Sequence, residues 1–495
     1  MSLLGIDVGT SGCKAAAYGT GGGCVASANR EYPTVHPRPG WAELDSRLVL
    51  ARVKEVIAEV AAQTAHDPIT ALCVSSMGEA MTPVARDGQA LANSILQVDI
   101  RGTEYALRLE ADFGREAFYA INPNIPGPNY SLPKLLWLRD NEPALFNSAW
   151  KFLLWGDLVS FMLGGEPVTS YALANRTLLF DIRKEAWSEP LLKWSGIEAE
   201  CLPRPVPSGT VAGEVRDDVA AELGLPKGVK IVVGAHDQCC GALGAGICTG
   251  GKAVCGMGTV ECITPVYDGI PPAETMLPLG LNVEHHVLPG LYLSFLYNQS
   301  GSLVKWFRDT FAADLRGDDV YGALMGEMPE APSRLLVLPH FEMTGAPNFI
   351  TDSAGVIAGL RTSTERGEIL KAIIEGAAFH FVESLDALRG LGMDMSEFIA
   401  TGGGAKSAAW LQIKADIYGV PFVRPKVTEC GALGAAILAG CATGVFNGPA
   451  EAVIRFVARD RIFEPNMSRH AHYREMHAKY RQVYPALKGL LTELG

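Results

Sequence analysis

Two aspartates follow strand-like segments at places where they could take part in phosphate chemistry. The first, Asp7, lies between the apolar run 3–6 and a Gly-Thr turn at 9–10. Backbone N–H groups and hydroxyls in such a turn can contact phosphate oxygens. A single carboxylate at a strand end also meets the preference of Mg²⁺ for one or two protein carboxylates together with water and nucleotide phosphates.

A second copy of this turn, at 256–259, lies about half a chain further on, and both copies are flanked by strand-like runs. One copy alone is explained equally well by an ordinary β-hairpin, because Asp and Thr commonly satisfy the backbone of turns. The repetition favours a two-sided phosphate clamp made by two related halves of the chain.

The second aspartate, Asp237, follows a strongly apolar strand-like run at 230–233 and begins a segment of small residues with a helical pattern. Ligands of α/β sheets bind beyond the carboxyl ends of the strands. A carboxylate there can accept the proton of a substrate hydroxyl as that oxygen attacks the γ-phosphorus of ATP. The alternative is a helix N-cap, which taken alone is the simpler interpretation of an Asp after a strand.

A run of three glycines at 402–404 joins a predicted strand at 397–400 to a predicted helix at 408–418. Glycines let the backbone approach a flat ring or a phosphate closely. The segment is not a P-loop, because Ala405 stands where that pattern requires glycine and the first glycine of the pattern is absent. Contact with adenosine and a generic strand-to-helix turn remain equally weighted.

A candidate for binding the phosphoryl acceptor is the segment 75–80, which follows a predicted strand at 71–74. Polyhydroxy ligands are bound by fixed carboxylates and guanidinium groups. Asp99 and Arg101 follow this segment along the chain and are a second candidate. For that pair alone, a surface salt bridge is the preferred interpretation.

An α/β framework is needed to position these segments. Strand-like runs alternate with longer helical patterns, for example 49–62 and 368–388. A chain of 495 residues is too long for one hydrophobic core. The sequence therefore predicts two related domains, 1–246 and 247–495, that face each other across a ligand cleft, with the charged tail after 451 closing the second domain.

Composition excludes several classes of partner. The net charge is −12 and the basic residues are scattered, which argues against binding to nucleic acid or to an anionic membrane surface. Eleven cysteines without a C-x-x-C pair, and a start that does not resemble a signal peptide, predict a cytoplasmic protein with reduced thiols. The apolar segment 430–446 is predicted to be a buried helix, because it is short for a membrane span and rich in small residues.

Taken together, the segments 5–14, 234–244, 256–259, 401–420 and 430–440 resemble the FGGY carbohydrate kinases, which are relatives of actin and of the Hsp70 ATPase domain. The resemblance covers nearly the whole chain. It implies two ribonuclease-H-like domains, with ATP bound mainly by the second domain and the sugar mainly by the first.

The resemblance also implies roles for individual residues. Asp7 resembles the magnesium-associated carboxylate and Asp237 the catalytic base. The implied contacts to ATP are Thr10, Ser11, Gly258, Thr259, Gly403, Gly404 and Ser407, and the implied contacts to the sugar are Met77, Gly78, Glu79, Asp237 and Gln238.

The substrate loop differs from the pattern of any one subgroup. Xylulose kinases tend to have Met-His-Gly where this chain has Met77-Gly78-Glu79, and the glutamate resembles that of glycerol kinases, although the arginine that precedes it there is missing. We expect Mg²⁺- and ATP-dependent phosphorylation of a pentulose such as xylulose, with glycerol, erythritol or gluconate as alternative substrates. Two rival interpretations are an Hsp70- or actin-like ATPase switch without a sugar substrate and a sugar sensor that has lost catalysis; a homodimer is left open.

Overall fold

The computed structural model describes residues 1–316, 319–346, 349–427 and 429–494. Its first half contains a six-stranded sheet in the order β13-β14-β5-β1-β2-β3. The central strand β1 is antiparallel to β2 and parallel to β5, which is in turn parallel to β14. The strands are β1 (Ser2–Val8), β2 (Gly12–Gly19), β3 (Cys24–Glu31), β5 (Ile69–Ser76), β13 (Val211–Glu214) and β14 (Lys230–His236).

The sheet of the second half repeats this plan. Its order is β17-β18-β16-β15-β22-β23-β24, with β19 paired to β16. Here β15 is antiparallel to β16 and parallel to β22, and β23 continues in parallel. The strands are β15 (Lys252–Met257), β16 (Val260–Asp268), β17 (Glu284–His285), β18 (Leu291–Leu293), β19 (Leu296–Gln299), β22 (Phe398–Thr401), β23 (Phe422–Pro425) and β24 (Arg459–Phe463). The prediction of two ribonuclease-H-like α/β units is confirmed.

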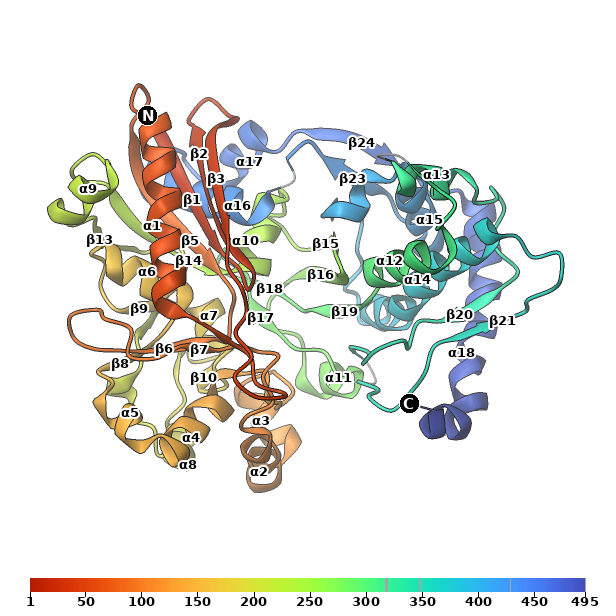
Figure 1. The fold of residues 1–495 in the computed structure, drawn as a ribbon, viewed down its shortest axis with the longest axis horizontal. Coiled ribbons are helices and arrows are strands. Elements are labelled where there is room, and N and C mark those ends of the chain that lie inside the picture. The colour runs from red at the N-terminus through yellow and green to blue at the C-terminus, as the bar shows by residue number, and fades with distance from the viewer. Residues whose placement is uncertain (317–318, 347–348, 428, 495) are drawn as a thin grey trace.

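Helices cover the outer faces of both sheets (Figure 1). On the first sheet, α1 (Ser46–Gln63) packs on β2 and β3, and its N-cap Asp45 accepts hydrogen bonds from two backbone N–H groups of the first turn. α6 (Trp155–Leu163) and α9 (Asp217–Leu223) share the hydrophobic core on the same side of this sheet. The second half carries α12 (Gly301–Phe311), α13 (Val320–Gly326), α14 (Arg366–Gly390), α15 (Ala408–Tyr418) and α18 (Met467–Leu494), with the short pair β20 (Leu336–Leu338) and β21 (Val356–Ala358).

Most residues between β5 and β13, apart from α6, form an additional lobe below the first sheet in Figure 1. Its own apolar core includes Phe118, Leu136, Phe152 and Leu179, all without solvent exposure. The lobe contains α2 (Thr103–Phe113), α3 (Arg115–Ile121), α4 (Ser131–Asn141), α5 (Pro143–Ser148), α7 (Tyr171–Asn175) and α8 (Glu189–Ser195), together with short strands such as β6 (Met81–Val84) and β8 (Lys151–Leu154).

Two helices, α10 (Asp237–Gly244) and α16 (Cys430–Ala442), lie between the two sheets and pack on each other. Glycines allow their backbones to touch. A Cβ at Gly434 would lie 1.9 Å from the carbonyl oxygen of Cys240, and a Cβ at Gly244 would lie 1.9 Å from that of Cys430. On its other side α16 packs on β1, where a Cβ at Gly5 would lie 1.8 Å from the carbonyl oxygen of Ala432. A helix late in the chain therefore belongs to the packing of the first sheet.

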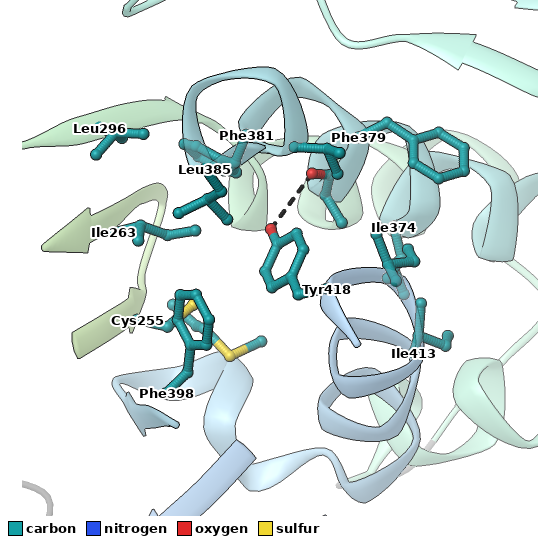
Figure 2. Packing of buried hydrophobic residues seen from close by; sticks show 14 of the residues in the cluster. Cys255, Ile263, Leu296, Ile374, Phe379, Phe381, Leu385, Phe398, Ile413 and Tyr418 are labelled. Atoms are coloured by element: carbon teal, nitrogen blue, oxygen red, sulfur yellow. Dashed lines mark hydrogen bonds between the residues drawn. The ribbon is translucent and has the colours of Figure 1, made fainter. Parts of the chain in front are cut away.

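The core of the second half joins the sheet to α14 and α15. Figure 2 shows Cys255 of β15 and Phe398 of β22 packed with Tyr418 of α15 and Phe381 of α14. Tyr418 satisfies its buried hydroxyl by donating to the carbonyl oxygen of Ala378 at 3.3 Å. These contacts fix the strand that leads into the second Gly-Thr turn.

The elements predicted from the sequence are present. The runs 71–74 and 230–233 lie in β5 and β14, and the patterns 49–62 and 368–388 lie in α1 and α14. The segment 430–446 forms α16 through Ala442, and most of that helix is buried. No helix among the described residues has the length and apolar character of a membrane span. In the tail, α18 packs on α15, whereas α17 (Pro449–Phe456) packs on α16 and reaches the β2–β3 turn.

The contact between α10 and α16 gives a first prediction. We expect Gly434→Ala to lower the free energy of unfolding by about 1–3 kcal/mol, because the new methyl group must push apart two helix backbones. Gly489→Ala is the matched control, since a Cβ there has no neighbour within 4 Å and alanine favours the helix α18. The thermal unfolding midpoint of each variant measures the effect. Equal midpoints for Gly434→Ala and Gly489→Ala would show that the helix contact is not tight.

Candidate active site

Asp7 lies near the end of β1, beside the first Gly-Thr turn. Ser75, its neighbour on the parallel strand β5, donates a hydrogen bond to Oδ1 at 2.8 Å. Lys14 lies opposite on β2, but its Nζ pairs with Glu429 at 3.0 Å. Burial raises the pKa of Asp7 to about 6, although the hydrogen bond from Ser75 lowers it. Asp7 therefore carries a carboxylate without a cation in direct contact among the described residues.

The surroundings of Asp7 fit a magnesium ion whose other ligands are not protein side chains. Oδ2 of Asp7 has no hydrogen-bond partner among the described residues, and a Cβ on the adjacent Gly431 would lie 3.0 Å from that oxygen. Glycine thus keeps the space beside the free oxygen open. No group of three or more His, Cys, Asp or Glu arranged to bind a metal occurs in the described part of the chain. A cation at Asp7 would need water and phosphate oxygens as its other ligands.

The first Gly-Thr turn is a tight hairpin that exposes its hydroxyls. The N–H of Gly9 donates to the carbonyl oxygen of Gly12 at 2.9 Å, and the hydroxyl of Tyr32 donates to the carbonyl oxygen of Gly9 at 2.7 Å. Thr10 is half-buried and Ser11 is exposed at the tip. The backbone of the turn is therefore held from behind while both side chains remain accessible.

Asp237 is the first residue of α10, directly after β14. The N-cap position is taken by His236, and no side-chain capping bond is formed at this helix start. Oδ1 of Asp237 is buried and has no hydrogen-bond partner among the described residues. The N-cap interpretation of Asp237 is therefore wrong. The next residue, Gln238, begins α10 with it and is half-buried.

The electrostatic surroundings keep the carboxyl of Asp237 close to its titration point at neutral pH. Burial, and then the charges of Asp7 and Glu79, raise the pKa of Asp237 to about 7, while Gln238 lowers it. Nε2 of His236 lies 3.2 Å from Oδ1, outside hydrogen-bond geometry. Burial and then the charge of Arg176 lower the pKa of His236 well below its usual range, so this imidazole is neutral.

The predicted substrate loop, Met77 to Glu79, follows β5 and is buried. Glu79 accepts a hydrogen bond from Nε of Arg176 at 2.8 Å and a second one from Nη2 of the same side chain. Nη1 of Arg176 donates to Glu284 at 2.9 Å. The guanidinium lies 4.7 Å from the ring centroid of Tyr130. The loop thus contacts a buried guanidinium contributed by another part of the chain.

Sequence reasoning missed Arg176, Tyr130 and Glu284. The available signal was an arginine inside the otherwise apolar and small-residue segment 171–180.

The expectation of a surface salt bridge between Asp99 and Arg101 is also wrong, because these residues are only 1% and 6% exposed. Trp41 covers the guanidinium of Arg101 at 3.8 Å, and Glu43 and Lys134 add charge contacts. This second network fixes the chain entering α2, and no hydrogen bond links it to Arg176 among the described residues.

A cavity of about 900 Å³ lies in the second half of the molecule. It is lined by five of the predicted ATP contacts, namely Gly258, Thr259, Gly403, Gly404 and Ser407. Apolar walls come from Val304 of α12, Met325 of α13 and Trp410 of α15. The contributions from α12 and α13 carried no recognisable signal in the sequence. The size and the apolar walls fit a purine nucleoside, with polar backbone at one end.

The glycines around this cavity allow three segments to meet. A Cβ at Gly404 would lie 2.9 Å from the Cβ of Met257, and a Cβ at Gly301 would lie 2.2 Å from the carbonyl oxygen of Gly258. Gly403, by contrast, has no atom within 4 Å of its Cβ position, so its backbone is open to a ligand. Ser407 caps α15 by accepting a hydrogen bond from the N–H of Trp410 at 3.3 Å.

Asp237 interacts electrostatically with one residue of each sheet, Asp7 and Cys262. The charge of Asp7 on β1 acts on Asp237, as described above. On the other side, burial and, more weakly, the charge of Asp237 raise the pKa of the Cys262 thiol on β16 to about 12. Because Asp7 is on β1 and Cys262 is on β16, Asp237 interacts electrostatically with residues on the strands next to both Gly-Thr turns.

Comparison with known proteins agrees with this arrangement. The family model described as the N-terminal domain of the FGGY family of carbohydrate kinases matches residues 2–244, and the model of the C-terminal domain matches residues 269–443. A xylulose kinase of Bacillus subtilis is 29% identical over 99% of this chain and 98% of its own length. A glycerol kinase of Stenotrophomonas maltophilia is 31% identical over 94% of both chains.

The solved structure of gluconate kinase from Lactobacillus acidophilus matches the fold with a TM-score of 0.90 and 26% identity, covering 100% of this chain and 99% of the other. The three similar proteins differ in the substrate that their names give. The chain belongs to the FGGY family of carbohydrate kinases and is an ATP-dependent phosphotransferase that acts on an alcohol group of a sugar or polyol.

Proposed function

We propose that this kinase transfers the γ-phosphoryl group of ATP to a hydroxyl of a pentulose such as xylulose, with Asp237 as the catalytic base. The observation that carries the proposal is the carboxylate of Asp237, whose Oδ1 is buried and has no hydrogen-bond partner among the described residues, at the start of a helix that lies between the two sheets. A buried acceptor without a partner costs free energy, and a substrate hydroxyl would satisfy it.

In this mechanism Asp237 accepts a hydrogen bond from the substrate hydroxyl and takes its proton as the oxygen attacks phosphorus. The transition state of phosphoryl transfer is loose, so the proton moves late and orientation of the hydroxyl matters as much as basicity. Glu79 and Gln238 would orient the remaining hydroxyls, with Met77 and Gly78 forming the wall of the site. The pKa of about 7 lets Asp237 both accept and release a proton near neutral pH.

ATP would lie with its adenosine in the 900 Å³ cavity and its phosphates toward the first sheet. Gly403, Gly404 and Ser407 would contact the nucleoside, while Gly258 and Thr259 would contact the phosphates. Thr10 and Ser11 of the facing turn would complete the phosphate site. Asp7 would hold Mg²⁺, which when bound neutralises charge on the phosphate oxygens.

A pentulose is the first choice of substrate because a xylulose kinase is among the most similar full-length relatives. Glycerol remains the alternative that Glu79 favours, since glycerol kinases have a glutamate at this position, and a glycerol kinase matches at comparable identity. Membership of a carbohydrate-kinase family does not support the alternative of an ATPase switch without a sugar substrate. The domain boundary at 246/247, a cytoplasmic location and a homodimer stay predictions.

The first test of the proposal is a substrate panel. Purified protein with Mg-ATP is incubated with xylulose, ribulose, glycerol, erythritol and gluconate, and ADP release is measured. We expect release that depends on the acceptor, with xylulose giving the highest kcat/KM. ADP release at the same slow rate with and without every acceptor would contradict phosphorylation of these compounds.

Asp237→Asn tests the base directly. We expect kcat to fall by about 10²–10⁴-fold, because the amide cannot take the proton, while the affinity for ATP measured by calorimetry changes little. Asp218→Asn is the matched control, since that side chain is 75% exposed on α9 and should leave kcat unchanged. Full turnover by the Asp237→Asn variant would remove this residue from the role of base.

The pH dependence of kcat/KM provides a second check on Asp237. The pKa of about 7 means that the ionised form is lost as the pH falls through 7, so kcat/KM should decrease about tenfold per unit below that value. Protonation of Asp7, with a pKa of about 6, should steepen the loss at lower pH. A rate that is constant between pH 5.5 and 8, or that rises toward acid, would contradict an ionised base at this position.

A further inference from the structure

We infer that the buried side chains Glu79, Arg176 and Glu284, here called the acceptor triad, make this kinase selective for neutral polyhydroxy acceptors over sugar acids. Arg176 is the specificity-determining residue that holds the triad together. The inference rests on the proposed function, because it concerns the acceptor beside Asp237, but it names a property that the family does not fix: one similar structure is a gluconate kinase.

The acceptor triad joins three parts of the chain that are far apart in sequence. Glu79 belongs to the loop after β5, Arg176 follows α7, and Glu284 begins β17. Their exposed fractions are 7%, 7% and 0%. Asn175 adds a hydrogen bond to Glu284 at 2.6 Å, and Phe295 lies 5.5 Å from the guanidinium. Removing one member of this buried group would leave an uncompensated charge, which is costly. The three side chains therefore depend on one another for their positions.

Gly78 shows that the guanidinium stem and the site beside Asp237 share one wall. A Cβ at Gly78 would lie 2.9 Å from Cγ of Arg176 and 2.7 Å from Cδ2 of His236. The absence of a side chain at position 78 therefore lets Arg176 pass next to the residue that precedes the base. The Arg-Glu pattern of glycerol kinases is missing from the loop itself, and here the guanidinium beside Glu79 comes from position 176.

The triad has hydrogen-bonding capacity left for a ligand. Both contacts of Arg176 with Glu79 go to Oε1, so Oε2 of Glu79 has no partner among the described residues. A guanidinium has five N–H groups. Glu79 takes two of them, Glu284 takes one and Asn124 lies 3.5 Å from Nη1, which leaves one N–H on Nη2. One acceptor and one donor suit a hydroxyl, which both donates and accepts.

The charge balance of the triad disfavours an anionic acceptor. Two carboxylates face one guanidinium, so the triad offers no excess positive charge to an anion, and Asp237 adds a negative charge when it is ionised. The adjacent His236 is neutral and contributes no positive charge. A carboxylate placed in this buried site would lose its hydration and meet like charges, which costs several-fold more in a desolvated site than in water. A neutral hydroxyl would instead donate to Glu79 or Asp237.

The test uses pairs of acceptors that differ only in a terminal CH₂OH or COO⁻ group: xylitol with xylonate, glucitol with gluconate, and glycerol with glycerate. Each compound is tested as a phosphoryl acceptor and as a competitive inhibitor against xylulose, or against the best acceptor of the panel. We expect the acid of each pair to bind at least about 100-fold more weakly than the neutral compound. Equal or tighter binding of the acids would overturn the inference.

Two variants test the triad itself. Glu79→Gln removes one negative charge, so the preference for the neutral member of each pair should shrink by about tenfold or more, while the KM for ATP stays the same. Arg176→Gln should raise the KM for the neutral acceptor and strengthen the preference against acids. Arg204→Gln is the matched control for Arg176→Gln, because that side chain is 64% exposed and pairs with the similarly exposed Glu166 rather than with the triad. An unchanged preference in both triad variants would overturn the inference.

The outcomes separate this inference from the proposed function. A wild-type enzyme that phosphorylates neutral compounds and sugar acids equally well refutes the role of the triad and leaves the kinase assignment and Asp237 intact. A wild-type enzyme whose ADP release depends on none of the compounds, with Asp237→Asn equally active, refutes the proposed function. ATP affinity of each variant, measured by calorimetry, shows that a loss of selectivity does not come from misfolding.

Discussion

The close approach of α10 and α16 is the contact on which the rest of the structure depends. Gly244 and Gly434 allow each helix backbone to touch the other, and Gly5 allows α16 to lie against β1. One helix begins with Asp237, and the other begins beside Asp7, whose free oxygen faces Gly431. The glycines that allow these helices to pack closely therefore also determine the positions of Asp7 and Asp237.

In this arrangement the carboxylates of Asp7 and Asp237 have no lysine or arginine in direct contact among the described residues. The charge of Asp7 raises the pKa of Asp237, and burial is the largest cause of the raised pKa of both carboxyls. In the proposed function, a phosphate-bound cation and a substrate hydroxyl would stabilise these carboxylates. In the acceptor triad, by contrast, the guanidinium of Arg176 pairs with the carboxylates of Glu79 and Glu284. Some hydrogen-bonding atoms of the triad remain free.

The sequence predicted what depends on local pattern and repetition. The two Gly-Thr turns, the paired sheets and the buried helix predicted at 430–446 follow from alternation and from small-residue spacing. The structure confirms them, with the helix ending earlier, at Ala442. Arg176 was missed because its partners are 97 and 108 residues away, a separation that no local pattern reveals. The burial of Asp99 with Arg101 was missed because the covering ring, Trp41, comes from another segment.

The most direct test of the account is a crystal structure with xylulose, Mg²⁺ and a non-hydrolysable ATP analogue. The account predicts adenosine in the cavity beside Gly403, the γ-phosphate between the Thr10 and Thr259 turns, and a substrate hydroxyl within hydrogen-bond distance of Asp237. A γ-phosphate bound away from both turns, or a sugar whose hydroxyls do not contact Asp237, would contradict it.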